Sequence, residues 1–282
     1  MKPRHNTPDR TMIKQSVLIY GHPGVGKTTF CSEIPDALFL ATEKGYRSLE
    51  IDVIDIDSWA TFCESVEYIR EGKHPYKAVV IDTVDNLLYL AGDLAVKSYN
   101  RRKHKAHKYM NEVPFQEAHA IAREMIRPQL DTLSKLPYGL FLISHAIPMT
   151  DSTGMIKYVP SLDKGIAAFT SFFVDIVLFV KTDKTRYESE AYTKPDPGYD
   201  AKDRTGLLPG KFDFRYPLFA DAFKNQIDYK SKFKTLWKTD KEGTTKLHKE
   251  MLQKVGRDYL LQDEYRQLIE NYQKQKPNGG KQ

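Results

Sequence analysis

The sequence is poor in cysteine, and it has no long apolar run. Its two cysteines, Cys31 and Cys63, have the spacing of neither a metal site nor a disulfide framework. No stretch approaches the roughly 18–20 apolar residues that cross a bilayer, and the opening MKPRHNTPDRTMIK lacks the apolar core of a secretory signal. We therefore expect no zinc site, no membrane partner, a cytoplasmic location and a flexible basic leader over residues 1–13.

Acidic residues are scarce in two segments of a chain whose net charge is +6. Residues 97–108 contain six Lys or Arg and no Asp or Glu, and residues 221–282 contain 14 Lys or Arg against 9 Asp or Glu. Because the positive charge is concentrated rather than spread, the pattern favours contact with a polyanion.

Apolar runs and helical patterns alternate along the first 217 or so residues. The runs predict strands at 16–20, 37–42, 77–87, 138–146, 172–181 and 187–195. Helical spacing predicts helices at 27–34, 58–72 and 115–137, the last with a kink before Pro128. Because the strands are continuously apolar, we expect an α/β fold with a mostly parallel central sheet flanked by helices.

The pattern changes after about residue 217, where apolar residues recur at helical intervals among lysines. These residues are Phe219, Phe223, Phe233, Trp237, Leu247, Met251, Val255, Tyr259 and Leu268. They predict a lysine-rich helical C-terminal appendage at 218–282, behind a core at 14–217.

The most specific motif is GHPGVGKT at residues 21–28, which fits G-x-x-x-x-G-K-[ST]. Gly21 and Gly26 permit a sharp turn that brings backbone N–H groups around a phosphate, and the next helix adds its positive end. Lys27 supplies a cation for the β- and γ-phosphates, and Thr28 a hydroxyl for Mg²⁺. The motif therefore predicts that MgATP binds at Gly21, His22, Pro23, Gly24, Val25, Gly26, Lys27, Thr28 and Thr29.

Acidic residues that follow two other predicted strands could supply the remaining groups that nucleotide hydrolysis needs. Asp82 is our candidate for the Mg²⁺ shell, with Asp85 as its competitor and a plain strand cap as the alternative. Glu43 follows the second strand, where it would polarise the attacking water; otherwise it is a solvated loop glutamate. Ser144 and His145 end the fourth strand, so His145 is either a sensor of the γ-phosphate or an ordinary strand-end histidine. The predicted catalytic residues are Lys27, Glu43 and His145.

In this order the motifs resemble the RecA-like ATPase core, and more narrowly the phage-encoded ATP-binding proteins related to single-strand annealing recombinases. The resemblance covers about residues 14–210. It rests on the P-loop, on TE-x-G at Thr42 to Gly45, on VVIDT with Asp82, on Ser144–His145, and on AKDRTG at 201–206. RecA itself has an amide where His145 stands.

This resemblance implies a RecA-like P-loop NTPase fold and a Mg²⁺-dependent, DNA-stimulated ATPase that acts on single-stranded DNA in recombination or annealing. It also implies a homo-oligomer, a recombination or single-strand-binding protein as partner, and the cytoplasm of a bacterial host if the chain is phage-encoded. Lys194, Lys202 and Arg204 would then act on the nucleotide of a neighbouring subunit; the alternative is an exposed basic loop.

The basic segment at 100–110 is the predicted DNA site. Its phosphate contacts would be Arg101, Arg102, Lys103, Lys105 and Lys108, flanked by Tyr99 and Tyr109 as stacking surfaces. We expect a mobile connection at the nucleotide edge of the sheet; a solvated basic loop is the alternative.

Two other functions remain open from the residues alone. A loader or remodelling ATPase of the AAA+ type acts on a protein and carries a helical lid with a sensor arginine; the appendage offers only Arg257 and Arg266. A small-molecule P-loop kinase carries an arginine-rich lid, for which residues 183–206 offer Arg186 and Arg204.

Overall fold

The computed structural model describes residues 5, 11–150, 152, 154–183, 185, 187–224 and 229–275. The chain divides into two compact units. The first comprises Met1–Gly206 and Gly210–Tyr216, and the second comprises Leu207–Pro209 and Pro217–Gln282. Each unit is described by itself.

In the described part of the chain, the strands of the first unit form one ten-stranded sheet. The strands are β1 (Ser16–Gly21), β2 (Ala37–Ala41), β3 (Asp52–Asp55), β4 (Ala78–Asp82), β5 (Gly139–Thr150), β6 (Ile156–Pro160), β7 (Ile176–Asp183), β8 (Glu188–Tyr192), β9 (Lys202–Asp203) and β10 (Lys211–Asp213). From β7 through β1, β5, β4 and β2 to β3 every pairing is parallel, and β6, β8, β9 and β10 add antiparallel pairings. The expected mostly parallel α/β sheet is confirmed.

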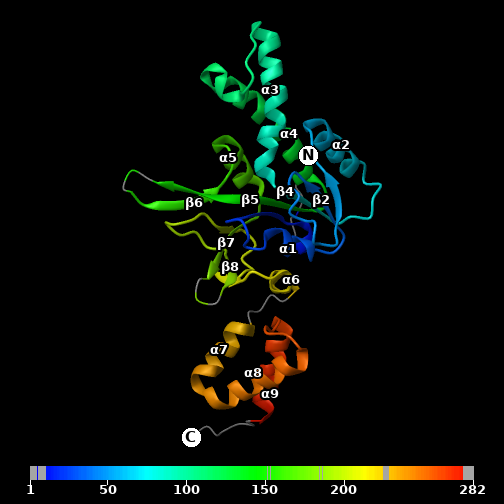
Figure 1. Cartoon of the computed structure of the whole chain (residues 1–282). Coiled ribbons are helices and arrows are strands. Elements are labelled where there is room, and N and C mark those ends of the chain that lie inside the picture. Colours follow the sequence, from blue (N-terminus) through cyan, green and yellow to red (C-terminus); the bar gives the residue numbers. More distant parts are fainter. Residues whose placement is uncertain are drawn as a thin grey trace. The chain divides into compact units, whose positions relative to one another are not determined.

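Helices cover both faces of this sheet. They are α1 (Lys27–Ser32), α2 (Trp59–Glu71), α3 (Leu87–Lys103), α4 (Glu117–Lys135) and α5 (Lys164–Phe173). In Figure 1, α2, α3 and α4 lie on one side of the strands and α1 lies on the other. The Ser58 hydroxyl caps α2 by accepting from the N–H of Thr61, and Gly72 ends the helix at φ +69°. The prediction of a helix at 58–72 is therefore confirmed.

Helix α3 corrects the prediction of a loop after the third strand. The strand was expected to run to residue 87 but ends at Asp82, and the 17 residues of α3 follow it after a short 3₁₀ turn, η2 (Val84–Asn86). Three of the expected loop cations, Arg101, Arg102 and Lys103, form the last turn of this helix. The apolar pattern does not predict this helix, because its buried side includes Ala91, Gly92 and Ala95. Such small residues give only a weak apolar periodicity.

Other expectations also fail at element boundaries. The strand predicted at 172–181 begins only at Ile176, because α5 occupies residues up to Phe173. The short strand β3 is partly exposed at the edge of the sheet, so it lacks a continuous apolar run. The predicted helix around Pro128 is present, since α4 continues through this proline to Lys135, and the kink before Pro128 stays a prediction.

The second unit is helical, as expected for the C-terminal segment. It contains most of α6 (Tyr216–Lys224), then α7 (Tyr229–Thr239), α8 (Lys241–Val255) and α9 (Gln262–Gln275). Its apolar cluster consists of Phe233, Leu247, Met251, Leu260, Tyr265 and Leu268. Within the described ranges of either unit, no helix is both long enough and apolar enough to span a membrane.

Replacing Phe62 by alanine should destabilise the first unit by about 3–5 kcal/mol, because its ring is fully buried between α2 and the sheet. Urea unfolding followed by circular dichroism measures the change. Tyr68→Ala removes a ring that is 40% exposed on the same helix and should change stability far less. Equal losses in the two variants would contradict the packing described here.

Candidate active site

The loop between β1 and α1 has the backbone of a phosphate cradle. Gly24 has φ +82° and Gly26 has φ +85°, a left-handed conformation that favours glycine. A Cβ on either would meet no atom within 4 Å, so conformation rather than space requires glycine at these two positions. Successive N–H groups in such a turn form an anion-binding concavity.

Gly21 is required for a different reason, because β1 is enclosed between two strands. It pairs with His145 of β5 on one side and with Val180 of β7 on the other. A Cβ at Gly21 would lie 2.4 Å from the carbonyl oxygen of Val180. The tight fit fixes the point at which the loop leaves the sheet.

Lys27 is held inside the loop that it follows. Its side chain is almost buried, and Nζ donates to the carbonyl oxygens of Gly21 at 2.9 Å and His22 at 3.0 Å. Burial lowers the pKa of Lys27, while the negative charges of Asp82, Asp85 and Glu43 act in the opposite direction. The ammonium group is thus positioned for an incoming anion.

The other residues of the predicted cradle differ in their exposure. His22 contacts the ring of Tyr158 edge-on at 5.1 Å between centroids, and Val25 is buried. Pro23 is exposed in the loop, and Thr29 is exposed on α1. The structure therefore brings the whole predicted P-loop together at the end of β1.

Thr28 and Asp82 form an oxygen pair beside the loop. The Thr28 hydroxyl donates to Oδ2 of Asp82 at 2.7 Å. Asp82 is 5% exposed, and burial raises its pKa while the hydrogen bond from Thr28 lowers it. A hydroxyl and a carboxylate suit Mg²⁺, which is usually bound by one or two protein groups, phosphate oxygens and water. The described residues contain no group of three or more His, Cys, Asp or Glu side chains that could hold a metal by itself.

Glu43 is fixed by the chain that follows β4. Its Oε1 accepts from the Thr83 hydroxyl at 3.1 Å and from Nδ2 of Asn86 at 3.0 Å. The Thr42 hydroxyl donates to the carbonyl oxygen of Thr83 at 2.9 Å, which ties the ends of β2 and β4 together. Glu43 is therefore an oriented carboxylate at the edge where β1 ends, and not a freely solvated side chain.

Asp85, the competing Mg²⁺ candidate, is directed to His145 instead. Its Oδ2 accepts from the backbone N–H of His145 at 2.7 Å and lies 2.9 Å from Nδ1 of the same residue. Burial raises the pKa of Asp85, and hydrogen bonds from Ser144 and His145 lower it. Thus Asp82 faces the P-loop, and Asp85 orients the imidazole of His145. This residue lies within β5 and does not end the strand as predicted, because β5 continues to Thr150 and pairs there with β6.

A family model described as an AAA domain matches residues 13–205, more than half of the chain. The chain belongs to this AAA domain family. No curated protein gives a significant match. Membership indicates a P-loop ATPase domain, in agreement with the loop geometry and its oxygen pair.

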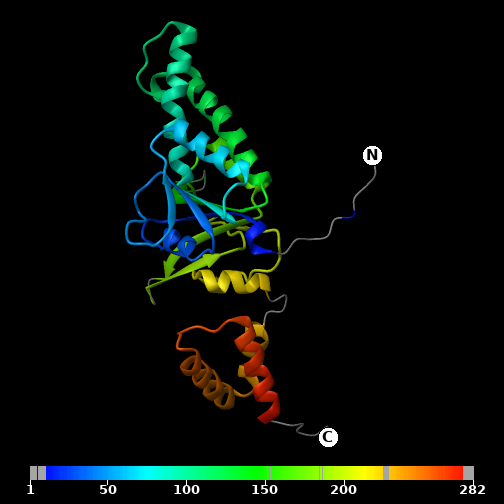
Figure 2. The same cartoon turned by 90° about the vertical axis from the view of Figure 1, so that its right-hand side faces the viewer.

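The basic segment of this AAA domain lies away from the P-loop. Helix α3 starts just after the Glu43 network, and its 17 residues extend for about 25 Å. Arg102 pairs with Glu117 at 3.0 Å, and the Lys108 ammonium lies 5.3 Å from the ring centre of Tyr109. The structure brings these cations to the far part of the α3–α4 hairpin, which Figure 2 shows in cyan and green.

One predicted stacking surface in this segment is wrong. Tyr99 is 6% exposed and belongs to the apolar core, because it occupies the buried side of α3. Tyr109 is 57% exposed and can still stack on a base.

The cations proposed to act on a neighbouring subunit lie apart from the AAA domain's own P-loop. Lys202 belongs to β9 and pairs with Val177 near the start of β7, whereas Gly21 pairs with Val180, three residues further along that strand. Nζ of Lys202 donates to the carbonyl oxygen of Ser171 at 2.6 Å, and the N–H of Arg204 donates to the carbonyl of Asp175. Lys194 follows β8. Their action between subunits stays a prediction.

Sequence reasoning missed the roles of the residues that orient the candidate catalytic groups, and it considered Asp85 only as a Mg²⁺ ligand. Thr83 and Asn86 hold Glu43, and Asp85 holds His145. The available signal was the density of polar side chains in DTVDN, residues 82–86, directly after a buried strand.

Gly21→Ala should weaken nucleotide binding more than Gly24→Ala, because only the first places a methyl group against a backbone carbonyl. We expect Gly21→Ala to cost about 1–3 kcal/mol of stability and to displace the loop. Gly24→Ala, with a positive φ but open space, should cost about 1 kcal/mol. Fluorescent ATP titration and thermal melts of both variants test this ordering, and the reverse order would contradict the assigned strand packing.

Proposed function

We propose that this AAA domain binds and hydrolyses MgATP on a RecA-like core, and that it acts on single-stranded DNA in recombination or strand annealing. The observation that carries the proposal is the meeting of Lys27, the Thr28–Asp82 pair and Glu43 at one edge of the sheet.

Each residue has a separate task in hydrolysis. Lys27 exchanges its carbonyl partners for the β- and γ-phosphate oxygens. Thr28 and Asp82 would hold Mg²⁺, and the ion would supply positive charge to offset the negative charge of the phosphates. Glu43 accepts the proton of the attacking water, with its carboxylate kept in place by Thr83 and Asn86.

His145 is suited to report the state of the nucleotide. It pairs with Gly21 across the sheet, and Asp85 fixes its ring. A change at the P-loop would therefore pass into β5 and the β6 hairpin that follows it.

Support for a DNA substrate comes from the α3–α4 hairpin. Arg101, Arg102 and Lys103 are exposed at the end of α3, and Lys105 and Lys108 follow them. Clustered cations beside an exposed Tyr109 suit a phosphate backbone with an adjacent base.

A loader acting on a protein partner is the second candidate, favoured by the AAA family match and by a helical unit after the core. The arginines of that unit are already paired, Arg257 with Glu264 and Arg266 with Asp263. For the kinase alternative, Arg186 lies outside the described residues, and Arg204 lies beside β9, away from the P-loop. Stimulation of the ATPase by single-stranded DNA favours the first proposal, and stimulation only by a protein favours the second.

Glu43→Gln should retain ATP and lose turnover, because an amide holds water but does not take its proton. We expect kcat to fall roughly 100-fold or more with little change in fluorescent ATP affinity. Lys27→Ala is the matched comparison: it should lose ATP affinity while thermal melts show a folded protein. An unchanged kcat in Glu43→Gln would remove this residue from the mechanism.

Replacing Arg101, Arg102 and Lys103 together by alanine should flatten the salt dependence of DNA binding. A site that neutralises five phosphates gives a slope of log K against log salt of about −3.5. The slope of the triple variant should be less steep by about 2 units. Alanine at Lys73, Lys77 and Lys135, which are exposed elsewhere, removes equal charge as a control. Equal slopes for the triple variant and the wild type would place the DNA site elsewhere.

A further inference from the structure

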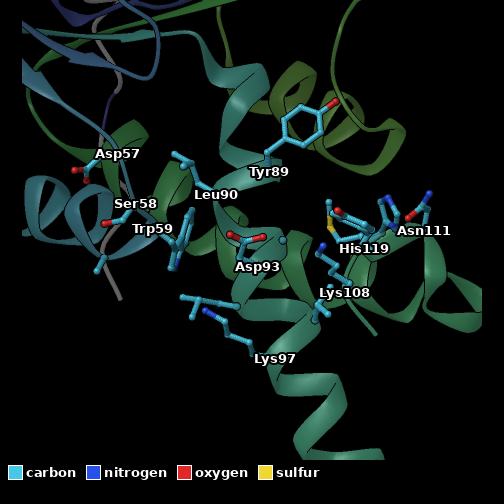
Figure 3. A pocket seen from close by; sticks show the side chains of 16 residues that line it. Asp57, Ser58, Trp59, Tyr89, Leu90, Asp93, Lys97, Lys108, Asn111 and His119 are labelled. Carbon is cyan, nitrogen blue, oxygen red and sulfur yellow. The ribbon is translucent and has the colours of Figure 1, made fainter. Parts of the chain in front are cut away.

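An open cavity of about 640 Å³ lies between the start of α2, one side of α3 and residues 108–111. This volume falls within the range of small-ligand sites. Figure 3 shows Asp93 near its middle, with Trp59 on one side and Lys108 and His119 on the other. The cavity is separate from the P-loop, and the proposed mechanism does not use it.

Several polar groups at this cavity have no partner in the described part of the chain. Asp93 and Lys97 form neither a hydrogen bond nor an ion pair there, although they stand one helical turn apart. Nδ1 of His119 is buried without a hydrogen bond. Tyr89 is 70% exposed at the rim, with its hydroxyl unbonded among the same residues. A carboxylate, an ammonium and aromatic edges are thus presented together to an incoming molecule.

These residues continue into the basic end of the hairpin. Tyr89, Asp93, Lys97 and Arg101 follow one another at intervals of four, which places them on one side of α3. Lys108 and the exposed Tyr109 border the same cavity from the returning segment. A chain that contacts Arg101 through a phosphate can therefore place its next residue in the cavity.

We propose that this cavity binds one unstacked base of single-stranded DNA. This inference rests on the proposed function, in which single-stranded DNA is the substrate. Tyr109 supplies a stacking surface, and Lys97 and Lys108 bind the flanking phosphates. Asp93 accepts a hydrogen bond from the exocyclic amino group of the base, as carboxylates do with cytosine. Thymine has no such group, so the cavity discriminates against it.

One wall of the cavity is linked through Asn86 to Glu43, the proposed catalytic glutamate. Helix α3, which forms one wall, begins directly after Asn86, and Asn86 donates to Glu43. The facing wall starts at Asp57 and Ser58, just after β3. A base held between α2 and α3 therefore constrains the residue that positions Glu43, which gives DNA a physical route to stimulate hydrolysis.

Fluorescence anisotropy with labelled oligonucleotides of about 20 nucleotides tests the proposal. We expect the wild type to bind oligo-dC about tenfold more tightly than oligo-dT. Asp93→Ala should abolish this preference by weakening the binding of oligo-dC alone. Tyr109→Ala should weaken the binding of both oligonucleotides about tenfold. Tyr187→Ala, which removes an exposed tyrosine elsewhere, and Lys73→Ala should match the wild type.

The outcomes separate this inference from the proposed function. If the wild type binds neither oligonucleotide while fluorescent ATP still binds, the DNA substrate is wrong and the cavity assignment falls with it. If the wild type binds DNA without preferring oligo-dC, or if Asp93→Ala retains the preference, the cavity assignment alone is overturned. Asp93→Asn provides a second variant, because its carbonyl oxygen still accepts a hydrogen bond and should preserve part of the preference.

Discussion

The enclosure of β1 between β5 and β7 is the constraint on which the active edge depends. It leaves no room for a side chain at Gly21, so the loop must leave the sheet there. The following turn uses two left-handed glycines, and Lys27 then folds back onto the carbonyls of Gly21 and His22. The position of the cation thus follows from strand packing, and not from a contact made by the lysine alone.

The end of β4 and the residues that follow it connect this loop to the neighbouring strands. Asp82 reaches Thr28, Thr83 and Asn86 reach Glu43, and Asp85 reaches His145. Four residues within one stretch of five therefore contact Glu43 after β2, His145 within β5 and the start of α1. Buried carboxylates are costly, and burial raises the pKa of both Asp82 and Asp85. Buried carboxylates with raised pKa values are typical of functional sites.

The residues that the sequence could identify are those with a strong local signal. The P-loop and Asp82 follow long apolar strands, and α2 has both a serine cap and a terminal glycine. Helix α3 could not be recognised because it buries small residues against α4, an arrangement that depends on tertiary packing. For the same reason Tyr99 was mistaken for a surface ring, and the choice between Asp82 and Asp85 required the geometry of the folded strands.

Because α3 is long, a small change of orientation at its first residues would move its far end by several ångströms. The helix is anchored near Glu43 through Asn86 and carries its arginines about 25 Å away. Over that length, a swing of about 10° at the base would move the tip by about 4 Å. A small rotation of α3 about its start near Glu43 would therefore displace its arginines by a distance comparable to the spacing of neighbouring bases.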